Sequence, residues 1–319
     1  MNTNTPALTN RLKKRFNHLK KWAKNTNITC FRVYDKDIPE YPLIIDWYCG
    51  NVVIWVYHRT LDDTPEKEEN YISQCLEEIE TGLNVNKSEI FLKRRLLQKG
   101  EKQYVKTSCE NQAFTVQEQG LKFEVNLSDY LDTGIFLDHR NTRNLVRQKA
   151  KGKSVLNLFA YTGSFTCYAI DGGASQTVTV DISNTYCNWT ARNFSLNHFE
   201  ESPKNSIIVA DCLAYIKDAK NRGLKFDIII CDPPTFSTSK KMADTSFVID
   251  RDYAKLLSDC LKLLAVNGTI YFSTNSRGFI LDETLLLENT KVKNITNFSI
   301  PEDFKNKKIH QCWEISKNS

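Results

Sequence analysis

Hydrophobic positions in the first part of the chain follow two different periods. Leu12, Phe16, Leu19 and Ala23 recur at helical spacing, which predicts an amphipathic helix over residues 9–24. The acidic segment 61–80 also has a helical pattern. Short apolar runs predict strands at 29–34, 90–95 and 104–107, and hairpins that join 43–48 to 52–57 and 113–116 to 122–125. We therefore predict an antiparallel α+β domain over residues 1–128.

The pattern changes after about residue 150, where buried strands alternate with helices. Apolar runs predict strands at 154–159, 176–180, 206–209, 226–231 and 269–273, with a helical segment between successive strands. This alternation is typical of βαβ units and of a doubly wound parallel sheet. Two further strands, at 291–298 and 309–315, have no helix between them and predict an antiparallel pair that closes the sheet. Residues 129–319 are thus predicted to form a Rossmann-like α/β domain.

The composition fits a globular protein and excludes few classes of function. The chain has 319 residues, 41% of them hydrophobic, and a net charge of +5, which suits about two folded domains. None of its ten cysteines is spaced as C-x-x-C, so we expect no zinc or iron–sulfur site and no bound metal. The N-terminus lacks a signal-peptide pattern, and the apolar runs are too short to cross a bilayer. These features predict a cytoplasmic protein in a reducing environment.

Acidic residues follow successive strands of the predicted parallel sheet. Gly163 lies in the turn after the first strand, and Asp181, after the second, lies 18 residues further on. Asp211 and Asp232 follow the third and fourth strands. Any one of them could be a surface aspartate or a helix N-cap. Because ligands bind at the carboxyl ends of such strands, the set together predicts an adenosine site in which Asp181 accepts hydrogen bonds from the ribose hydroxyls.

The turn after the first strand favours S-adenosylmethionine over a dinucleotide. A dinucleotide needs the pattern G-x-G-x-x-G so that helix amides can hold its pyrophosphate. Here only Gly163 is present, and Phe159, Tyr161 and Phe165 occupy the neighbourhood where small residues would be required. A P-loop sequence is absent as well. S-adenosylmethionine has no phosphate and requires no such loop, whereas a nicotinamide-dependent oxidoreductase is a weaker alternative.

The segment Asp232-Pro233-Pro234-Thr235-Phe236 predicts the substrate side of the site. Two prolines fix the backbone and donate no hydrogen bonds, so carbonyl groups and the Asp232 carboxylate can line a pocket. Phe236 can stack on a base. The alternative is a strand-terminating turn with a capping aspartate.

With these motifs the sequence resembles the K type of the bacterial 23S ribosomal RNA guanine-N7 methyltransferases. The resemblance covers nearly the whole chain and rests on FRVYDKDIPEY (31–41), NLSDYLDTGIFLDHRNTR (126–143), SVLNLFAYTGSFT (154–166), TVDISNTYCNWTARNFSLN (179–197), ADCLAYI (210–216), FDIIICDPPTFSTSKKM (226–242), FSTNSRGF (272–279) and KIHQCWEI (308–315). It implies a small N-terminal α+β domain followed by a class I methyltransferase domain. In some bacteria this unit is fused to a guanine-N2 methyltransferase, and the present chain resembles the stand-alone form.

The resemblance also implies roles for individual residues. Asp181 would bind the ribose, Ile182 and Ser183 would flank the adenine, and Asp211 and Cys212 would face its edge. The methionine part would be surrounded by Asn157, Phe159, Tyr161, Thr162 and Gly163. Phe136, His139 and Arg140 would lie over the cofactor, with Arg140 near its carboxylate, although Arg140 could instead contact phosphate or begin a helix.

Guanine N7 carries a lone pair and no hydrogen, so its methylation requires no general base. We therefore interpret Asp232 as an acceptor that holds guanine N1–H and N2–H and stabilises the cationic product, and not as a base. Lys240, Lys241, Arg251 and Asn275 are candidate donors to guanine O6 or to the RNA backbone.

Other reactions stay open at this point. The motif Asp-Pro-Pro-aromatic also serves amine methylation at guanine N2 or adenine N6. Methylation of cytosine C5 requires a cysteine nucleophile, which related enzymes carry where this chain has Thr274-Asn275-Ser276. A catalytically inactive RNA-binding protein is the alternative from another class.

Charge layout supports an RNA partner. Basic residues gather in three stretches with few acids between them, namely 11–24, 93–106 and 139–153. Such patches suit phosphate contacts that position an RNA whose target base is turned into the site. The basic face of the first helix could also be merely solvated. That the RNA is 23S ribosomal RNA rests on the resemblance, and the sequence leaves monomer and homodimer open.

Overall fold

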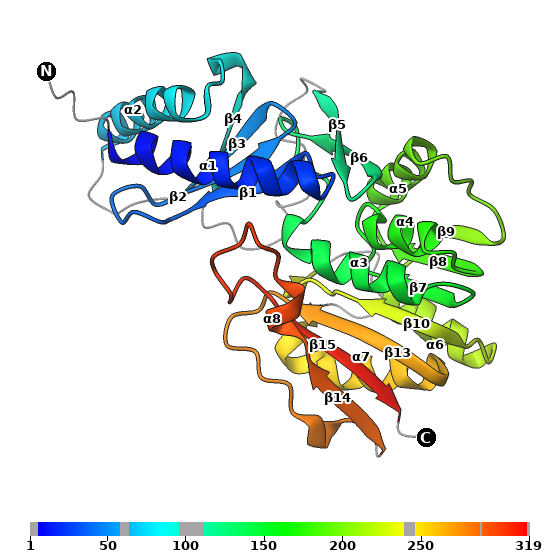
Figure 1. Cartoon of the computed structure of the whole chain (residues 1–319). Coiled ribbons are helices and arrows are strands. Elements are labelled where there is room, and N and C mark those ends of the chain that lie inside the picture. Colours follow the sequence, from blue (N-terminus) through cyan, green and yellow to red (C-terminus); the bar gives the residue numbers. More distant parts are fainter. Residues whose placement is uncertain (1–5, 58–63, 96–111, 239–245, 288, 318–319) are drawn as a thin grey trace, which may run out of the picture. The chain divides into compact units, whose positions relative to one another are not determined.

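The computed structural model describes residues 6–57, 64–95, 112–238, 246–287 and 289–317 (Figure 1). The chain divides into two compact units. The first comprises residues 1–133 together with 302–306, and the second comprises 134–301 together with 307–319. Of the expected elements, the strand at 104–107 lies outside the described residues. Within the described part, no helix is both long and apolar enough to span a membrane.

The first unit consists of a four-stranded sheet, two long helices and a separate hairpin. Its sheet has the order β1 (Cys30–Asp35), β2 (Leu43–Tyr48), β3 (Asn51–Tyr57) and β4 (Ile90–Arg95), and its helices are α1 (Ala7–Asn25) and α2 (Pro65–Leu83). The hairpin pairs β5 (Ala113–Glu118) with β6 (Leu121–Asn126). The expectation of a wholly antiparallel unit was wrong, because β3 and β4 are parallel. The chain between them passes through α2, and such a crossover allows parallel pairing.

Both long helices of the first unit contribute to one hydrophobic core. Leu8, Leu12 and Leu19 on α1 are fully buried, and Ile79 and Leu83 on α2 belong to the same cluster. These positions repeat at four or seven residues, so each helix turns one apolar face inward. The predicted amphipathic helix is therefore confirmed, and it begins two residues earlier than expected.

Residues 302–306 pack into the first unit although they come from far along the chain. Arg15 donates to the carbonyls of Glu302 and Asp303, and the Asp303 carboxylate accepts from the backbone N–H of Arg32 at 2.9 Å. The ring of Phe304 is buried, 4.5 Å below the Arg32 guanidinium. This short segment thus completes the packing of a unit whose other residues all precede 134.

The second unit has a seven-stranded sheet in the order β14-β15-β13-β10-β7-β8-β9 (Figure 1). Its strands are β7 (Ser154–Leu158), β8 (Gln176–Asp181), β9 (Asn205–Val209), β10 (Phe226–Cys231), β13 (Leu264–Thr274), β14 (Thr290–Asn294) and β15 (Gln311–Lys317). The first five pair in parallel, and β15 lies antiparallel between β13 and β14. The doubly wound sheet with an antiparallel closing pair is therefore confirmed. The strand order reverses between β7 and β10, which is where such sheets bind ligands.

Both faces of this sheet are covered. Its helices are α3 (Arg140–Lys149), α4 (Ser164–Asp171), α5 (Asn184–Leu196), α6 (Cys212–Asn221), α7 (Ile249–Leu263) and α8 (Thr296–Ser299). Alternate residues of one strand enter different cores: Val155 packs in the cluster that includes residues of α3 and α4, and Leu156 packs with residues of α6 and α7. Burial on both sides explains why these strands are continuous apolar runs.

The structure adds some short elements and corrects one strand. The predicted strand at 291–298 ends at Asn294, whose side-chain oxygen accepts from the backbone N–H of Thr296, the first residue of the short helix α8. A small pair, β11 (Phe236–Ser237) with β12 (Phe247–Val248), follows the proline motif. The short 3-10 turns are η1 (Lys87–Glu89), η3 (Leu137–His139) and η4 (Glu283–Leu285).

Candidate active site

The loop after β7 has an unusual backbone. Phe159, Tyr161 and Gly163 all have positive φ angles, of 53°, 52° and 72°. Large aromatic residues rarely adopt this conformation, which costs about 1–2 kcal/mol each unless surrounding bonds hold it. Here the backbone N–H of Phe159 bonds the Cys212 thiol sulfur at 3.1 Å, and that of Tyr161 bonds Asp181 at 2.9 Å. Strain of this kind concentrates at ligand sites.

Gly163 is required by packing as well as by its φ angle. A Cβ atom at this position would lie 2.3 Å from Cγ2 of Thr190 on α5. The sequence indicated a tight turn that lets a ligand approach the backbone. The tight turn is present, and the close approach that the structure contains is the one to α5.

Asp181 stands at the end of β8 with both carboxylate oxygens engaged. Oδ2 accepts from the N–H of Tyr161 at 2.9 Å, and Oδ1 accepts from the N–H of Ser183 at 2.8 Å. Burial raises the pKa of Asp181 to about 6, against the lowering effect of these backbone hydrogen bonds. Each oxygen retains a second lone pair. A buried carboxylate with spare acceptor capacity fits the two hydroxyls of a ribose.

Aromatic side chains gather around the same loop. The ring of Tyr161 lies 5.1 Å from that of Phe136 and 4.6 Å from that of Tyr186, and its hydroxyl accepts from the N–H of Gly134 at 2.9 Å. Phe136 is 41% exposed. Tyr161 and Phe136 therefore form an aromatic surface that is open on one side.

Two polar residues assigned to the cofactor are engaged inside the protein. The Thr162 hydroxyl donates to the carbonyl of Gly134 at 2.6 Å, and the Asn157 amide donates to Thr166 at 2.9 Å. Both residues are buried. Their side chains fix the loop and the strand, so they support the site from behind.

The residues after β8 and β9 cap the helices that follow. Ser183 accepts from the N–H of Tyr186 at 3.3 Å at the start of α5, with the half-buried Ile182 before it, and Asp211 accepts from the N–H of Leu213 at 3.1 Å at the start of α6. The alternative that an aspartate after a strand caps the next helix therefore applies to Asp211. The Cys212 side chain is buried in the core 3.6 Å from the carbonyl of Val180, and burial raises its thiol pKa well above the usual range.

The proline motif places Asp232 between two neighbours at the end of β10. The hydroxyl of Ser273, on the adjacent strand β13, donates to Oδ1 of Asp232 at 2.6 Å. Nε2 of His139 lies 3.6 Å from Oδ2, and 27% of the Asp232 side chain is exposed. Asp232 is therefore hydrogen-bonded to Ser273, lies close to the His139 ring, and is partly exposed.

The rest of this motif lies close to the end of β13. Thr235 donates to the side-chain oxygen of Asn275 at 2.7 Å. Phe236 is 49% exposed, whereas Pro233 is buried and Pro234 half-buried. Of the other candidate donors, Arg251 bonds Asp252, and Lys240 and Lys241 lie outside the described residues.

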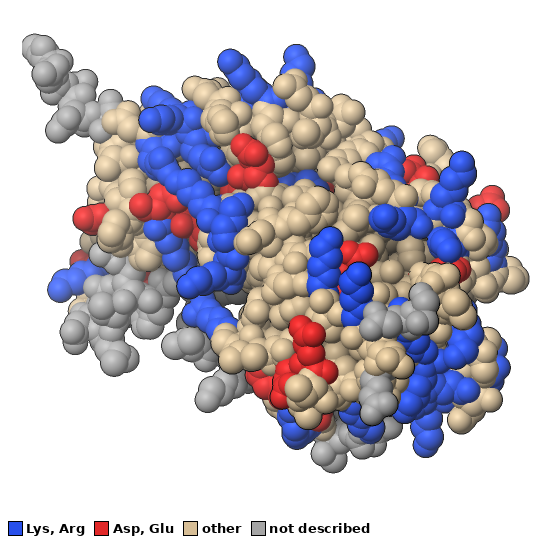
Figure 2. Space-filling model, turned by 60° about the horizontal axis from the view of Figure 1, so that its bottom comes forward, with Lys and Arg blue, Asp and Glu red and all other residues tan. Residues whose placement is uncertain are grey.

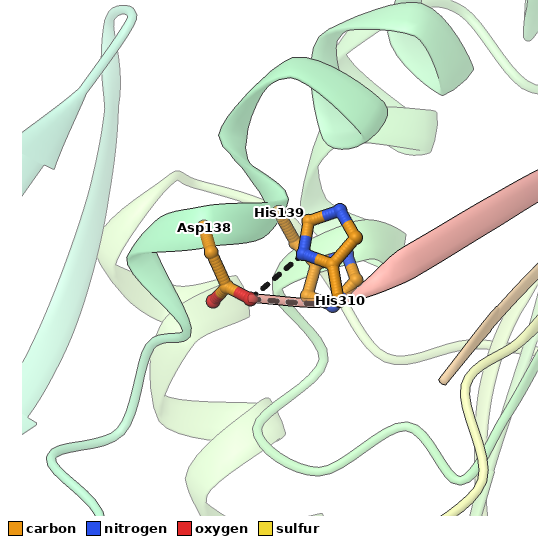
Figure 3. Close-up of side chains that lie close together, drawn as sticks. All are labelled: Asp138, His139 and His310. Atoms are coloured by element: carbon orange, nitrogen blue, oxygen red, sulfur yellow. Dashed lines mark hydrogen bonds and ion pairs between the residues drawn. The ribbon is translucent and has the colours of Figure 1, made fainter. Parts of the chain in front are cut away.

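The residues at the start of α3 are buried and contact a distant part of the chain. His139 and Arg140 are both buried, and the His139 ring stacks on His310, a residue just before β15 (Figure 3). Sequence reasoning assigned no role to His310, Ser273 or Ser299. The first two are brought to the site by neighbouring strands, and no spacing along the chain signals that meeting.

Many basic residues bind within their own unit. In the first unit, Arg11 pairs with Asp37 at 2.6 Å and Arg15 bonds backbone carbonyls. In the second, Arg143 is buried, Arg147 pairs with Asp171, and Lys153 pairs with Asp227. The exposed lysines on α1 are Lys13, Lys14, Lys20, Lys21 and Lys24, and those at the end of α3 and just after it are Lys149 and Lys151. Figure 2 shows several groups of Lys and Arg side chains on one face of the molecule.

Comparison with known proteins extends along the whole chain. A family profile described as S-adenosylmethionine-dependent methyltransferase matches residues 35–308. The chain is 47% identical, over 99% of its length, to ribosomal RNA large subunit methyltransferase K of Neisseria meningitidis serogroup B, of which it covers 89%. It is 44% identical, over 96% of its length, to methyltransferase K/L of Hahella chejuensis, of which it covers 42%. A crystal structure of a methyltransferase complexed with SAH has a TM-score of 0.75 at 24% identity, across 99% of this chain and 82% of that one.

Proposed function

Because the chain belongs to the S-adenosylmethionine-dependent methyltransferase family, alongside the large-subunit ribosomal RNA methyltransferases K, we propose that it methylates N7 of a guanosine in 23S ribosomal RNA. The observation that carries this proposal is the 47% identity over 99% of the chain. Against the K/L relatives the chain spans less than half of their length, so no activity of their remaining part is proposed for it. A ribosomal RNA substrate implies that the reaction takes place in the cytoplasm.

The class I methyltransferase fold is confirmed, and its ligand end suits the cofactor. S-adenosylmethionine supplies a methyl group on a sulfonium centre. Asp181 would hold its ribose, since its buried carboxylate keeps acceptor capacity toward hydroxyls. The strained loop 159–163 and the aromatic surface of Phe136 and Tyr161 would hold the remainder. The engaged side chains of Asn157, Thr162 and Cys212 fit supporting roles and not direct contacts.

Guanine N7 determines what this chain must do for the reaction. N7 attacks through a lone pair in the plane of the base and loses no proton, so the residues need to place it in line with the methyl group. Asp232 would accept from guanine N1–H and N2–H and would stabilise the positive charge of the product. Its partial exposure leaves this side open to a base, and the exposed ring of Phe236 would stack on that base.

Methylation of an exocyclic amine, at guanine N2 or adenine N6, is the second candidate. The observation that favours it is the position of Asp232 itself, since a carboxylate held at this strand end can also accept from an amine. Cytosine C5 methylation is disfavoured, because the segment after β13 reads Thr274-Asn275-Ser276 and supplies no cysteine.

The product distinguishes these reactions. Purified protein is incubated with S-adenosylmethionine and 23S ribosomal RNA from a strain lacking the gene, and the digested RNA is examined by mass spectrometry. We expect 7-methylguanosine in the RNA treated with wild-type protein. Asp181→Ala protein is the matched control and should not form it. N2-methylguanosine or N6-methyladenosine would overturn the N7 assignment, and no methylated nucleoside would overturn the RNA substrate.

A further inference from the structure

His139 lies between two carboxylates in the interior of the second unit. Its Nε2 atom is 3.6 Å from Oδ2 of Asp232 and 3.9 Å from Oδ2 of Asp138. The residue is 5% exposed and belongs to the turn η3, directly before α3. A ring in this position links the start of the domain to the carboxylate that ends β10.

The two ring nitrogens of His139 have different surroundings. Nδ1 is buried and has no hydrogen-bond partner among the residues that the structure describes. Nε2 faces two carboxylates, which only accept. These neighbours favour the tautomer with the proton on Nε2. Burial lowers the pKa of His139, with Asp232 acting in the opposite direction, and this shift favours the neutral ring.

A second histidine fixes the plane of this ring. The rings of His139 and His310 stack with centroids 4.3 Å apart and planes 11° from parallel (Figure 3). His310 is itself tied at both nitrogens, through Nδ1 to Asp138 at 2.9 Å and through Nε2 to the Ser299 hydroxyl at 2.8 Å. His139 packs on Phe165 as well, at 5.8 Å. The ring has little freedom to turn away from Asp232.

The same cluster is a weaker candidate for a metal site. Asp138, His139 and His310 offer ligand atoms within 4.8 Å of one another. The two rings are nearly parallel, however, so their in-plane lone pairs lie side by side and do not converge on one point. Both nitrogens of His310 already have partners. These three side chains are therefore better suited to fixing His139 beside the Asp232 carboxylate than to binding a cation.

We propose that His139 is a positioning residue that acts through Asp232. The Nε2 side of its ring, 3.6 Å from Oδ2, and the Ser273 hydroxyl, which donates to Oδ1, flank the carboxylate and keep its open side available to the incoming base. Asp138 and His310 hold His139 in turn. This inference rests on the proposed methyl transfer for its kinetic consequence, and it replaces the cofactor contact that the sequence suggested for His139.

Two substitutions distinguish whether His139 acts as a hydrogen-bond donor or only fills space beside Asp232. His139→Phe keeps a flat ring and removes the N–H, whereas His139→Gln retains an N–H donor. We expect His139→Phe to lower kcat at least tenfold while its affinity for SAH, from calorimetry, stays within about twofold of wild type. His139→Gln should recover most of the lost kcat. Equal losses in both variants, or a tenfold loss of SAH affinity, would overturn the inference.

Histidine ring NMR tests the same contact without methyl transfer. In full-length protein with 15N-labelled histidine, the His139 resonances should report a proton on Nε2 and none on Nδ1 at pH 7. In Asp232→Asn the Nε2 resonance should move, and those of His310 should stay. A proton on Nδ1, or an unmoved Nε2 resonance, contradicts the inference even if the RNA product is 7-methylguanosine. The expected spectra together with another RNA product would instead contradict only the proposed function.

Discussion

The carboxylate of Asp181 accepts a hydrogen bond from the backbone N–H of Tyr161 at 2.9 Å and thereby joins the end of β8 to the strained loop after β7. The same carboxylate is the candidate ribose ligand, so loop geometry and cofactor binding depend on one side chain.

Asp181→Ala should strongly reduce the stabilisation of the protein by SAH. The variant loses a charged hydrogen-bond partner of the ribose, worth about 1.5–3 kcal/mol of binding, and it frees the loop at Tyr161. Thermal unfolding with and without SAH measures the effect, with Asp218→Ala, an exposed position on α6, as the control. Unchanged affinity in calorimetry would remove Asp181 from the site.

Affinity for SAH should fall as the pH drops below about 6. The pKa of Asp181 is raised to about 6 by burial, so in the free protein the carboxylate becomes protonated in this range and no longer accepts from both hydroxyls. Stability of the free protein follows the opposite sign: a raised pKa contributes most at low pH, and that contribution is lost as the pH rises through about 6. Calorimetric titrations from pH 5 to 8 test this, and Asp181→Asn should show no such dependence.

Asp232→Asn should lower methyl transfer about a hundredfold and leave SAH affinity nearly unchanged. The variant keeps the shape of the side chain and removes the charge that stabilises the cationic product. Because N7 loses no proton, the chemical step should not titrate near neutral pH in wild type or variant. Single-turnover rates across pH 6–8 measure both points, and a wild-type rate that rises with a general-base titration would favour an amine substrate.

Replacing Lys13, Lys14, Lys20 and Lys21 with Gln should weaken RNA binding and flatten its salt dependence. These side chains are exposed on α1, and each lost phosphate contact should reduce the slope of log K against log salt by about 0.7–0.9. Arg11→Gln with Arg15→Gln is the matched control, because these two bond within the first unit and should affect stability more than the slope. An unchanged slope in the lysine variant would mean that this helix face is only solvated.

Gly163→Ala should destabilise the protein by about 2–4 kcal/mol. A methyl group would occupy a positive φ angle and collide with Thr190, whose Cγ2 would be 2.3 Å away. Adding Thr190→Ala removes the nearest atoms and should restore part of the loss. Denaturant unfolding of the two single variants and the double variant measures this coupling, and strictly additive effects would contradict it.

Most of the second unit could be predicted from the sequence because its strands and the residues that follow them are recognisable in short stretches of the chain. Each buried strand is a continuous apolar run, and acids or glycine follow where the strands end, so Asp181, Asp211 and Asp232 could be located at the correct ends. The parallel pairing of β3 with β4 was missed, since the pairing of strands joined by a long connection depends on where the intervening helix packs.

Contacts between distant segments of the site could not be predicted. The meeting of His139, Asp232 and His310 joins positions more than 70 residues apart, and no periodicity records it. The sequence also did not show which basic residues of one stretch are buried or paired and which are exposed. Arg143 and Arg147 were counted as candidates for RNA contact, but the first is buried and the second is paired with Asp171, while Lys149 and Lys151 nearby remain exposed.

Because residues 302–306 belong to the first unit, the place at which the chain is cut decides whether that unit keeps all of its parts. After a single cleavage between Thr133 and Gly134, the N-terminal fragment would still find part of its own core, Asp303 and Phe304, on the other fragment. Conversely, a truncation that ends before residue 302 would leave the Arg32 side chain without its aromatic neighbour in a fragment that otherwise contains the whole N-terminal sheet.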